Sequence, residues 1–237
     1  MQDYIIFHPH RTPFRVEGIA SISGAAEQPW CGTIYADRSH PKFTTNEDPF
    51  LWTAPWLYSY CHATQLRREA RQGRDVVDKG SRLFFCNGRD AQEGKLTIDT
   101  VFVVRRAHKW PKVGESPPTD LTRRLREDSA SNLRHFRHGM RAEGKRRHSG
   151  KYTYEANHEG PDRSFLPLDE KGNVFTIRAD RALLNVSAEE LKSRVPARRS
   201  SYPLMLTTSS ADRLYNICNV EADTRVFDIS RQVHTDG

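Results

Sequence analysis

Cysteine is scarce in this chain, and its spacing matches no known site. The 237 residues contain four cysteines, Cys31, Cys61, Cys86 and Cys218, which lie far apart in the sequence. No Cys-x-x-Cys pair or zinc-ribbon spacing occurs, and a chain of this length does not need a disulfide framework. We therefore expect free, buried thiols.

Long apolar runs are also absent. No stretch reaches the roughly 18 apolar residues of a membrane-spanning helix. The start, Met-Gln-Asp-Tyr, lacks the basic region and the apolar run of a signal peptide. We expect a soluble, cytoplasmic protein with no membrane partner.

Several motifs that hold cofactors or metals are missing. There is no Walker phosphate loop, no Gly-x-Gly-x-x-Gly before a helix, no His-Glu-x-x-His, and no His-x-Glu followed by Pro-Cys-x-x-Cys. These absences argue against Walker-type nucleotidases, dinucleotide-binding enzymes, zinc proteases and zinc deaminases. We expect no cofactor and no resident metal.

The sequence leaves one class of metal-dependent enzyme, a nuclease, as an alternative. Glu93-Gly94-Lys95 has the acid-x-Lys form of restriction-type nucleases, with Asp75 or Asp78 upstream. Gly94 indicates a turn, however, whereas that motif needs a strand.

Positive charge is what the chain has in excess. Lys and Arg number 37 against 30 Asp and Glu, which gives a formal net charge of +7 and a pI near 9.4. Hydrophobic residues make up 36% and charged residues 28%, a balance that fits a globular protein with a sizeable core. The surplus predicts a field that attracts polyanions.

The order of apolar and polar stretches indicates an α+β fold. Strands are expected at 4–7, 32–35, 82–86, 95–105, 152–156, 165–168, 174–177, 202–207 and 225–229, and helices at 56–71, 119–142, from 187 and at 211–218. Two prolines predict an irregular loop over His8 to Pro13. We expect a single domain over 1–237, with a mixed, largely antiparallel sheet flanked by helices and a basic helix or loop insertion at about 119–151.

The clearest element is a β-hairpin whose second arm runs from Lys95 to Arg105. Strict alternation places Leu96, Ile98, Thr100, Phe102 and Val104 on one face, and Thr97, Asp99, Val101 and Val103 on the other. Both faces are apolar, so we expect this strand to be central.

The strongest functional signal is a cluster of cations in the insertion. Its members are Arg134, Arg137, Arg141, Lys145, Arg146, Arg147 and Lys151, with Glu143 as the single acid among them. Closely spaced cations can each meet a phosphate oxygen and release counterions, and a helix at 133–141 would align the three arginines on one face. The alternative is a solvated basic loop. Tyr152 and Tyr154 follow directly and are candidates either for stacking on an exposed base or for the core.

Asp99 is the acid of most interest, because its neighbours Ile98, Thr100 and Val101 belong to an apolar strand. A buried carboxylate must be hydrogen-bonded, paired or reactive, and burial would suit it to general base work. The alternative is a structural aspartate tied to a backbone amide or to Arg82. Asn87, which ends the preceding arm, is expected at the same edge of the sheet.

The order of segments resembles a family of nucleotide-modification-associated domains of phages and bacteria. The matching parts are Lys79-Gly80-Ser81-Arg82-Leu83-Phe84-Phe85-Cys86-Asn87-Gly88, Ile98-Asp99-Thr100-Val101-Phe102-Val103-Val104, a segment at His135 to His138, and Tyr152-Thr153-Tyr154-Glu155-Ala156. The resemblance departs at His8 to Pro13, where the family has a Gly- and Ser-rich opening. It implies a protein that makes, removes or reads modified DNA bases, with site residues at Asp99, Asn87, His135 and Tyr154.

Together these signals predict an enzyme that acts on duplex DNA containing a modified base, in a conflict between phage and host. A glycosylase would extrude the base, stack it on Tyr152, Tyr154 or Trp52, and use Asp99 to activate water. The alternatives are a noncatalytic reader of modified bases and a metal-dependent nuclease.

Overall fold

A computed structural model describes residues 2–8, 11–23, 25–37, 49, 51, 56–59, 77–109, 152–178, 181–195 and 203–233. The expected insertion at 119–151 and most of the expected helix at 56–71 lie outside these ranges. In the described part of the chain, no helix has the length and apolar character needed to cross a membrane.

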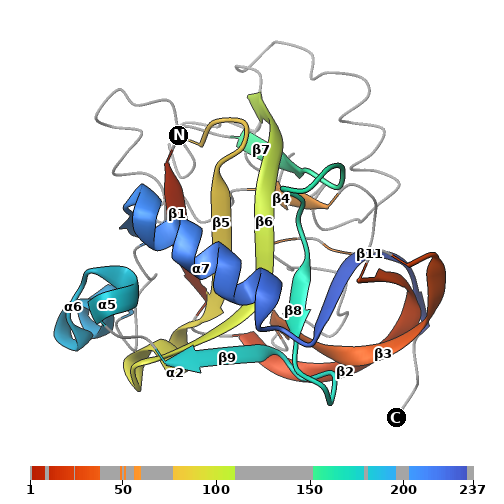
Figure 1. The fold of residues 1–237 in the computed structure, drawn as a ribbon, viewed down its shortest axis with the longest axis horizontal. Helices are drawn as coiled ribbons and strands as arrows, with labels where there is room; N and C mark the ends of the chain where they lie inside the picture. The colour runs from red at the N-terminus through yellow and green to blue at the C-terminus, as the bar shows by residue number, and fades with distance from the viewer. Residues whose placement is uncertain are drawn as a thin grey trace, which may run out of the picture.

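The larger of two sheets has seven strands (Figure 1). They are β1 (Asp3–His8), β4 (Leu57–Ser59), β5 (Arg82–Asn87), β6 (Lys95–Lys109), β7 (Tyr152–Ala156), β9 (Phe175–Arg178) and β10 (Leu204–Leu206). The order is β10-β1-β5-β6-β7-β4, and β9 also pairs with β6. Among the described strands of this sheet, β1 and β5 form the one parallel pair. The expected mixed, largely antiparallel sheet is confirmed, and β6 is central.

A second sheet was not expected from the sequence. It contains β2 (Arg11–Ile22), β3 (Glu27–Asp37), β8 (Leu166–Leu168) and β11 (Thr224–Val233), in the order β3-β2-β11-β8, and all its pairings are antiparallel. The irregular loop predicted for His8 to Pro13 is wrong from Arg11 onward. Pro13 pairs with Tyr35 of β3, while on the other side of β2 the described part of β11 pairs only with Glu17–Ile22, so this stretch of β2 has a single described neighbour, as is usual for a strand that contains proline.

Four described helices accompany the sheets: α2 (Gly88–Gln92), α5 (Arg181–Leu184), α6 (Ala188–Arg194) and α7 (Thr208–Val220). The predicted start of α6 is confirmed, because Ser187 Oγ accepts a hydrogen bond from the Glu190 amide at 3.1 Å. Figure 1 shows α7 lying across β1, β5 and β6. Its buried side chains recur at helical spacing: Ala211, Leu214, Tyr215 and Cys218.

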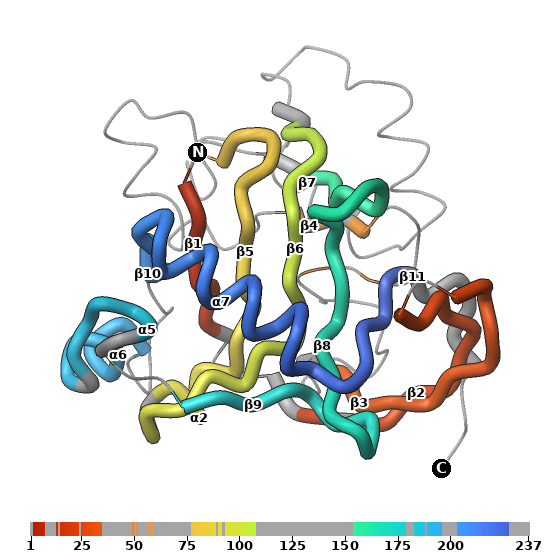
Figure 2. The backbone as a smooth tube through the Cα atoms, in the orientation of Figure 1, coloured from red at the N-terminus to blue at the C-terminus, as the bar shows by residue number. Residues whose placement is uncertain are grey.

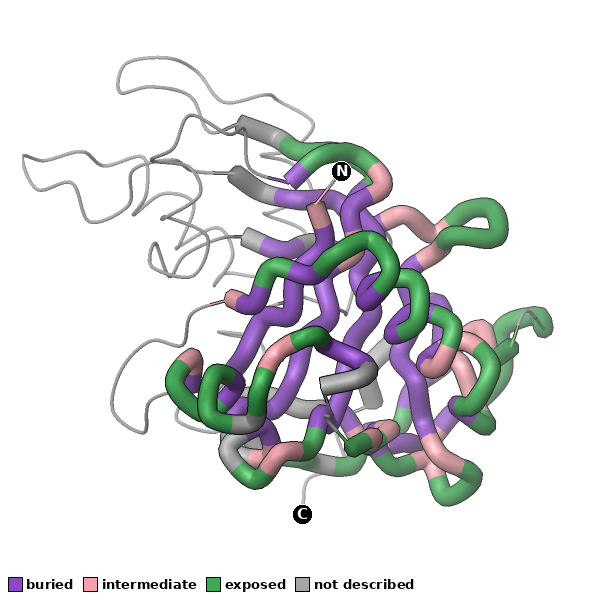
Figure 3. Tube along the Cα trace, turned by 60° about the vertical axis from the view of Figure 1, so that its left-hand side comes forward, coloured by how far each residue is buried: buried purple, intermediate pink, exposed green. Residues whose placement is uncertain are grey.

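Apolar side chains fill both faces of the large sheet. On one face Ile5, Phe84 and Cys86 pack with Leu191 and Leu214 of the helices. On the other face a second core lies between the two sheets and includes Tyr4, Ile6, Leu83, Phe85, Val16, Trp30 and Ile34. Figure 3 shows the buried residues running along the strands of the large sheet. This core between the two sheets was not predicted from the sequence.

A β-bulge at Asp99 changes the two faces of β6. Phe85 pairs with Thr100 and Cys86 pairs with Ile98, so Asp99 is an extra residue in β6. Ile98 and Val101 therefore belong to the same, helix-side core, while Phe102 belongs to the other core. The strict alternation expected along this strand is wrong at this point.

The helix expected at 56–71 is wrong where the structure describes it. Leu57–Ser59 forms β4, which pairs antiparallel with β7. The Tyr58 ring stacks on Tyr154, with centroids 6.1 Å apart, and meets Phe85 edge-on at 5.0 Å. In this segment the packing of Tyr58 on the sheet therefore outweighs the helical spacing of the apolar residues.

His158 joins the two sheets. The Trp56 amide donates to His158 Nε2 at 3.0 Å, so Nδ1 carries the proton and donates to the Phe227 carbonyl of β11 at 3.2 Å. The Trp56 and His158 rings also meet edge-on at 5.0 Å. One imidazole thus satisfies two backbone groups of distant segments.

We predict that His158→Ala lowers the free energy of unfolding by about 2 kcal/mol, because it leaves one amide and one carbonyl without partners. Urea denaturation measures this loss. Lys171→Ala, at an exposed turn position, is the control and is expected to unfold at the wild-type urea concentration. A His158→Ala midpoint equal to that of the control would contradict this role.

Candidate functional site

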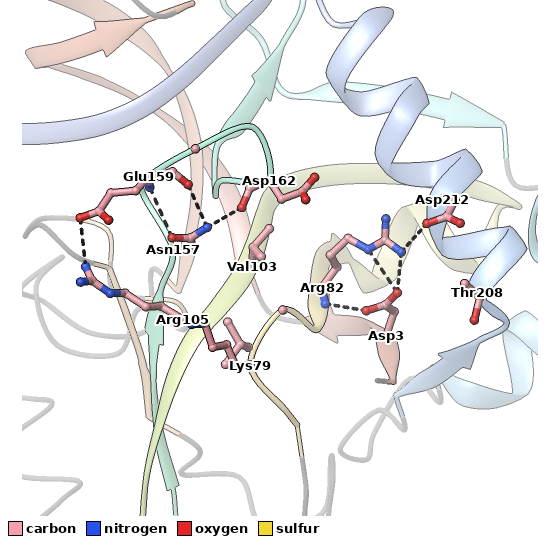
Figure 4. Close-up of a pocket in the computed structure, with 13 residues that line it drawn as sticks. Asp3, Lys79, Arg82, Val103, Arg105, Asn157, Glu159, Asp162, Thr208 and Asp212 are labelled. Atoms are coloured by element: carbon pink, nitrogen blue, oxygen red, sulfur yellow. Dashed lines mark hydrogen bonds and ion pairs between the residues drawn. The ribbon is translucent and has the colours of Figure 1, made fainter.

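A hollow of about 770 Å³ opens where the first residues of β1 and β5 meet α7 (Figure 4). Its described lining is largely charged: Asp3, Lys79, Gly80, Arg82, Val103, Val104, Arg105, Asn157, Glu159, Gly160, Asp162, Thr208 and Asp212. The volume lies within the range of small-molecule sites. These residues come from five separate parts of the chain, so only the fold brings them together.

Arg82 forms one wall of the hollow together with two carboxylates. Its Nε and Nη2 atoms donate to Asp3 Oδ2 at 3.1 and 2.8 Å, and its amide donates to Asp3 Oδ1 at 2.6 Å. Nη2 also donates to Asp212 Oδ1 of α7 at 2.7 Å. Burial alone would lower the pKa of Arg82, but the hydrogen bonds to Asp3 and Asp212 raise it above its ordinary value. Arg82 is therefore a permanent cation already committed to two partners.

The loop after β7 forms the opposite wall. Asn157 holds its shape, since Nδ2 donates to the carbonyls of Glu159 at 3.0 Å and Asp162 at 2.6 Å. The Asn157 amide donates to the Val103 carbonyl at 2.7 Å, which fixes the loop on β6. Tyr215 of α7 donates its hydroxyl to the Pro161 carbonyl at 3.3 Å. Burial, followed by the nearby Asp162, raises the pKa of Tyr215, so this donor stays protonated.

Two charged groups of the lining have no partner in the described part of the chain: the Lys79 ammonium and the Asp162 carboxylate. Among the described residues, Arg105 forms two long ion pairs, at 3.5 Å with Glu159 Oε1 and at 3.9 Å with Glu155 Oε1. The Glu159 side chain is 77% exposed, and pairs of this kind contribute little. Lys79, Arg105 and Asp162 are thus the groups available to a ligand.

The hollow lies at the base of an arm formed by β6 and β7. β6 extends beyond its pairing with β5, which ends at Val103, and pairs with β7 up to Lys109 and Tyr152. Figure 2 shows these two strand ends together at one end of the large sheet. Lys109 is four residues beyond Arg105, a distance of about 13 Å along a strand. The chain between 109 and 152 therefore leaves and re-enters the sheet at the tip of this arm, while the hollow lies at its base.

Asp99 lies elsewhere. It is 3% exposed and does not line the hollow, and its Oδ1 accepts a hydrogen bond from Thr100 Oγ1 at 2.8 Å. Burial, and next Asp99, raise the pKa of the neighbouring Cys86 well above its ordinary value. The alternative pairing with Arg82 is wrong, because Arg82 binds Asp3 and Asp212. The burial expected of Asp99 is confirmed, and its role in a reaction stays a prediction.

Asn87 lies at the opposite end of β5 from Arg82, about 16 Å away along the strand. It is 6% exposed and pairs with His8 across the parallel strands. Asn87 and Asp99 do share one region of the sheet, as expected, but the hollow is at the other end.

Of the aromatic candidates, Tyr154 is the one whose side chain the structure describes, and it does not line the hollow. Tyr154 is 1% exposed and stacks on Tyr58, so its ring does not reach a base in this conformation. Tyr152 begins β7 and pairs with Lys109. The remaining expected site residues lie outside the described part of the chain: Trp52, His135, Arg134, Arg137, Arg141, Lys145, Arg146, Arg147 and Lys151.

The nuclease-like pattern lies in a turn, as Gly94 indicated. Glu93 and Gly94 connect α2 to β6, Gly94 has a φ of +76°, and Lys95 pairs with Glu93 at 3.4 Å on the surface. Within the described residues, no three side chains of the metal-ligating types come together. The geometry of this segment does not support the restriction-type alternative.

No family model, curated protein or solved structure matches this chain. The resemblance to nucleotide-modification-associated domains therefore stays a prediction, and the site is argued from its geometry.

We predict that Arg82→Met lowers the free energy of unfolding by about 3 kcal/mol, because Asp3 stays buried without its guanidinium partner. Arg178→Met, at an exposed position of β9, removes the same charge and is expected to have little effect. Urea denaturation measures the free energy of unfolding of both variants. Equal losses in the two would show that Arg82 acts only through net charge.

Proposed function

We propose that the protein binds DNA through the cationic segment 134–151 and takes a modified nucleotide into the hollow. The observation that supports this proposal most is the pairing of Lys109 with Tyr152, which holds both ends of the intervening chain at the tip of the arm whose base carries the hollow. A cytoplasmic location, where DNA is accessible, is part of the proposal.

The seven cations of the segment provide the affinity. Each can neutralise one phosphate and release a counterion, an effect that does not depend on sequence. The hollow itself has no such surplus, since its described lining contains four carboxylates and three cations. The proposal therefore assigns binding of the duplex to the segment and selection of one nucleotide to the hollow.

The proposed reaction is cleavage of the N-glycosidic bond of an extruded nucleotide. Such a reaction needs a carboxylate that accepts a proton from water and stabilises positive charge on the sugar. We assign this role to Asp162, since it is exposed at the hollow and has no partner among the described residues. Water adds to the sugar carbon, the carbon–nitrogen bond breaks, and the base leaves with a proton.

We expect replacement of Arg134, Arg137 and Arg141 by Gln to reduce the slope of log affinity against log salt by about 3, because three phosphate contacts are lost. Fluorescence anisotropy with a labelled duplex measures this slope. The matched control replaces Lys95, Lys171 and Arg178, three exposed cations outside the segment. Similar slopes for the two triple variants would argue against binding through the segment.

The reaction is tested by incubating the protein with duplexes that contain modified or unmodified bases and detecting abasic sites by alkaline cleavage. We expect abasic sites on a modified duplex, and we expect Asp162→Asn to abolish them without weakening duplex binding. Asp212→Asn, already paired with Arg82, serves as the comparison. Selective binding without abasic sites would make the protein a reader of the modified base.

A further inference from the structure

We infer that Lys79 and Arg105 form a phosphate-binding subsite at the rim of the hollow, which holds a nucleotide by its 5′-phosphate. This inference rests on the proposed function for the identity of the ligand, and it adds the group by which the ligand is held.

The backbone brings the two cations together. The Gly80 amide donates to the Val104 carbonyl at 2.7 Å, and the Val104 amide donates to the Ser81 carbonyl at 2.9 Å. Lys79 and Arg105 flank this hydrogen-bonded pair, so their side chains start from adjacent positions. Figure 4 shows both on the same side of the hollow, with Asp212 and Thr208 of α7 on the other side.

The two cations differ in how they are held. Lys79 is exposed and makes no ion pair in the described part of the chain. Arg105 is 46% exposed and makes two long ion pairs, of which the one to Glu159 is the more exposed. A phosphate has more charge than a carboxylate and suits the planar donors of a guanidinium. It can therefore displace Glu159, and Glu159 acts as a competitor for the subsite.

The position of the subsite orients the rest of the nucleotide. Arg105 follows Val103 and Val104, which line the hollow, and lies at the base of the arm that ends at Lys109. A phosphate bound there lies on the side of the hollow from which the cationic segment departs. Its sugar and base then extend toward Asp162, the carboxylate assigned to the reaction.

The test is isothermal titration calorimetry, which measures the affinity of the full chain for the four 5′-deoxynucleoside monophosphates and for the corresponding nucleosides. We expect each monophosphate to bind at least about tenfold more tightly than its nucleoside, because charged hydrogen bonds provide the difference. Lys79→Gln should weaken the monophosphates by about tenfold and leave the nucleosides unchanged. Glu159→Gln should change affinity in the opposite direction and tighten the monophosphates.

Lys171→Gln is the control for loss of a single exposed lysine and should leave every affinity unchanged. Equal affinity for monophosphate and nucleoside, or an unchanged affinity in both Lys79→Gln and Glu159→Gln, would overturn the subsite. The triple variant at Arg134, Arg137 and Arg141 separates the two proposals. It should lose affinity for duplex yet keep its affinity for monophosphates.

Discussion

The contacts of Arg82 determine how the sheet, the helix and the hollow fit together. One guanidinium binds Asp3 at the start of β1 and Asp212 on α7, and its cation lies 5.4 Å from the centre of the Tyr215 ring. The Asp3 side chain is only 7% exposed, so it depends on this partner. The same contacts fix α7 over the sheet, and Tyr215 of α7 in turn holds the loop that carries Asp162. Through Asp212 and Tyr215, α7 thus connects the Arg82 wall of the hollow to the loop that carries Asp162.

β6 connects this framework to the proposed DNA-binding segment. Its first part is buried between two cores, and its last part forms an arm with β7. The change occurs near Arg105, where the residues of β6 become exposed. A rigid central strand therefore supports both the floor of the hollow and the point from which the cationic segment departs. The proposal thus assigns sequence-independent affinity to the segment 134–151 and selection of a nucleotide to the hollow.

The sequence predicted most of the strands because apolar alternation is a local signal, and it predicted the start of α6 because Ser187 and Glu190 form a local cap. It did not predict the bulge at Asp99, since one extra residue leaves the composition of the strand unchanged. It did not predict the hollow, because Asp3 and Arg82 are 79 residues apart, Arg82 and Asp212 are 130 residues apart, and only tertiary packing joins them. The apolar surroundings of Asp99 indicated burial correctly, but burial alone does not distinguish an enclosed carboxylate from a reactive one.

The central claim is that a nucleotide enters the hollow while the cationic segment holds the duplex. Photocrosslinking tests this claim most directly. The protein is crosslinked to a duplex that carries one photoreactive base, and mass spectrometry identifies the crosslinked peptides. The account predicts crosslinks to the loop 157–163 from the reactive base, and to 134–151 from a photoreactive group on a neighbouring phosphate. Crosslinks from the base to the region around Asn87 and Asp99, with none to 157–163, would contradict it.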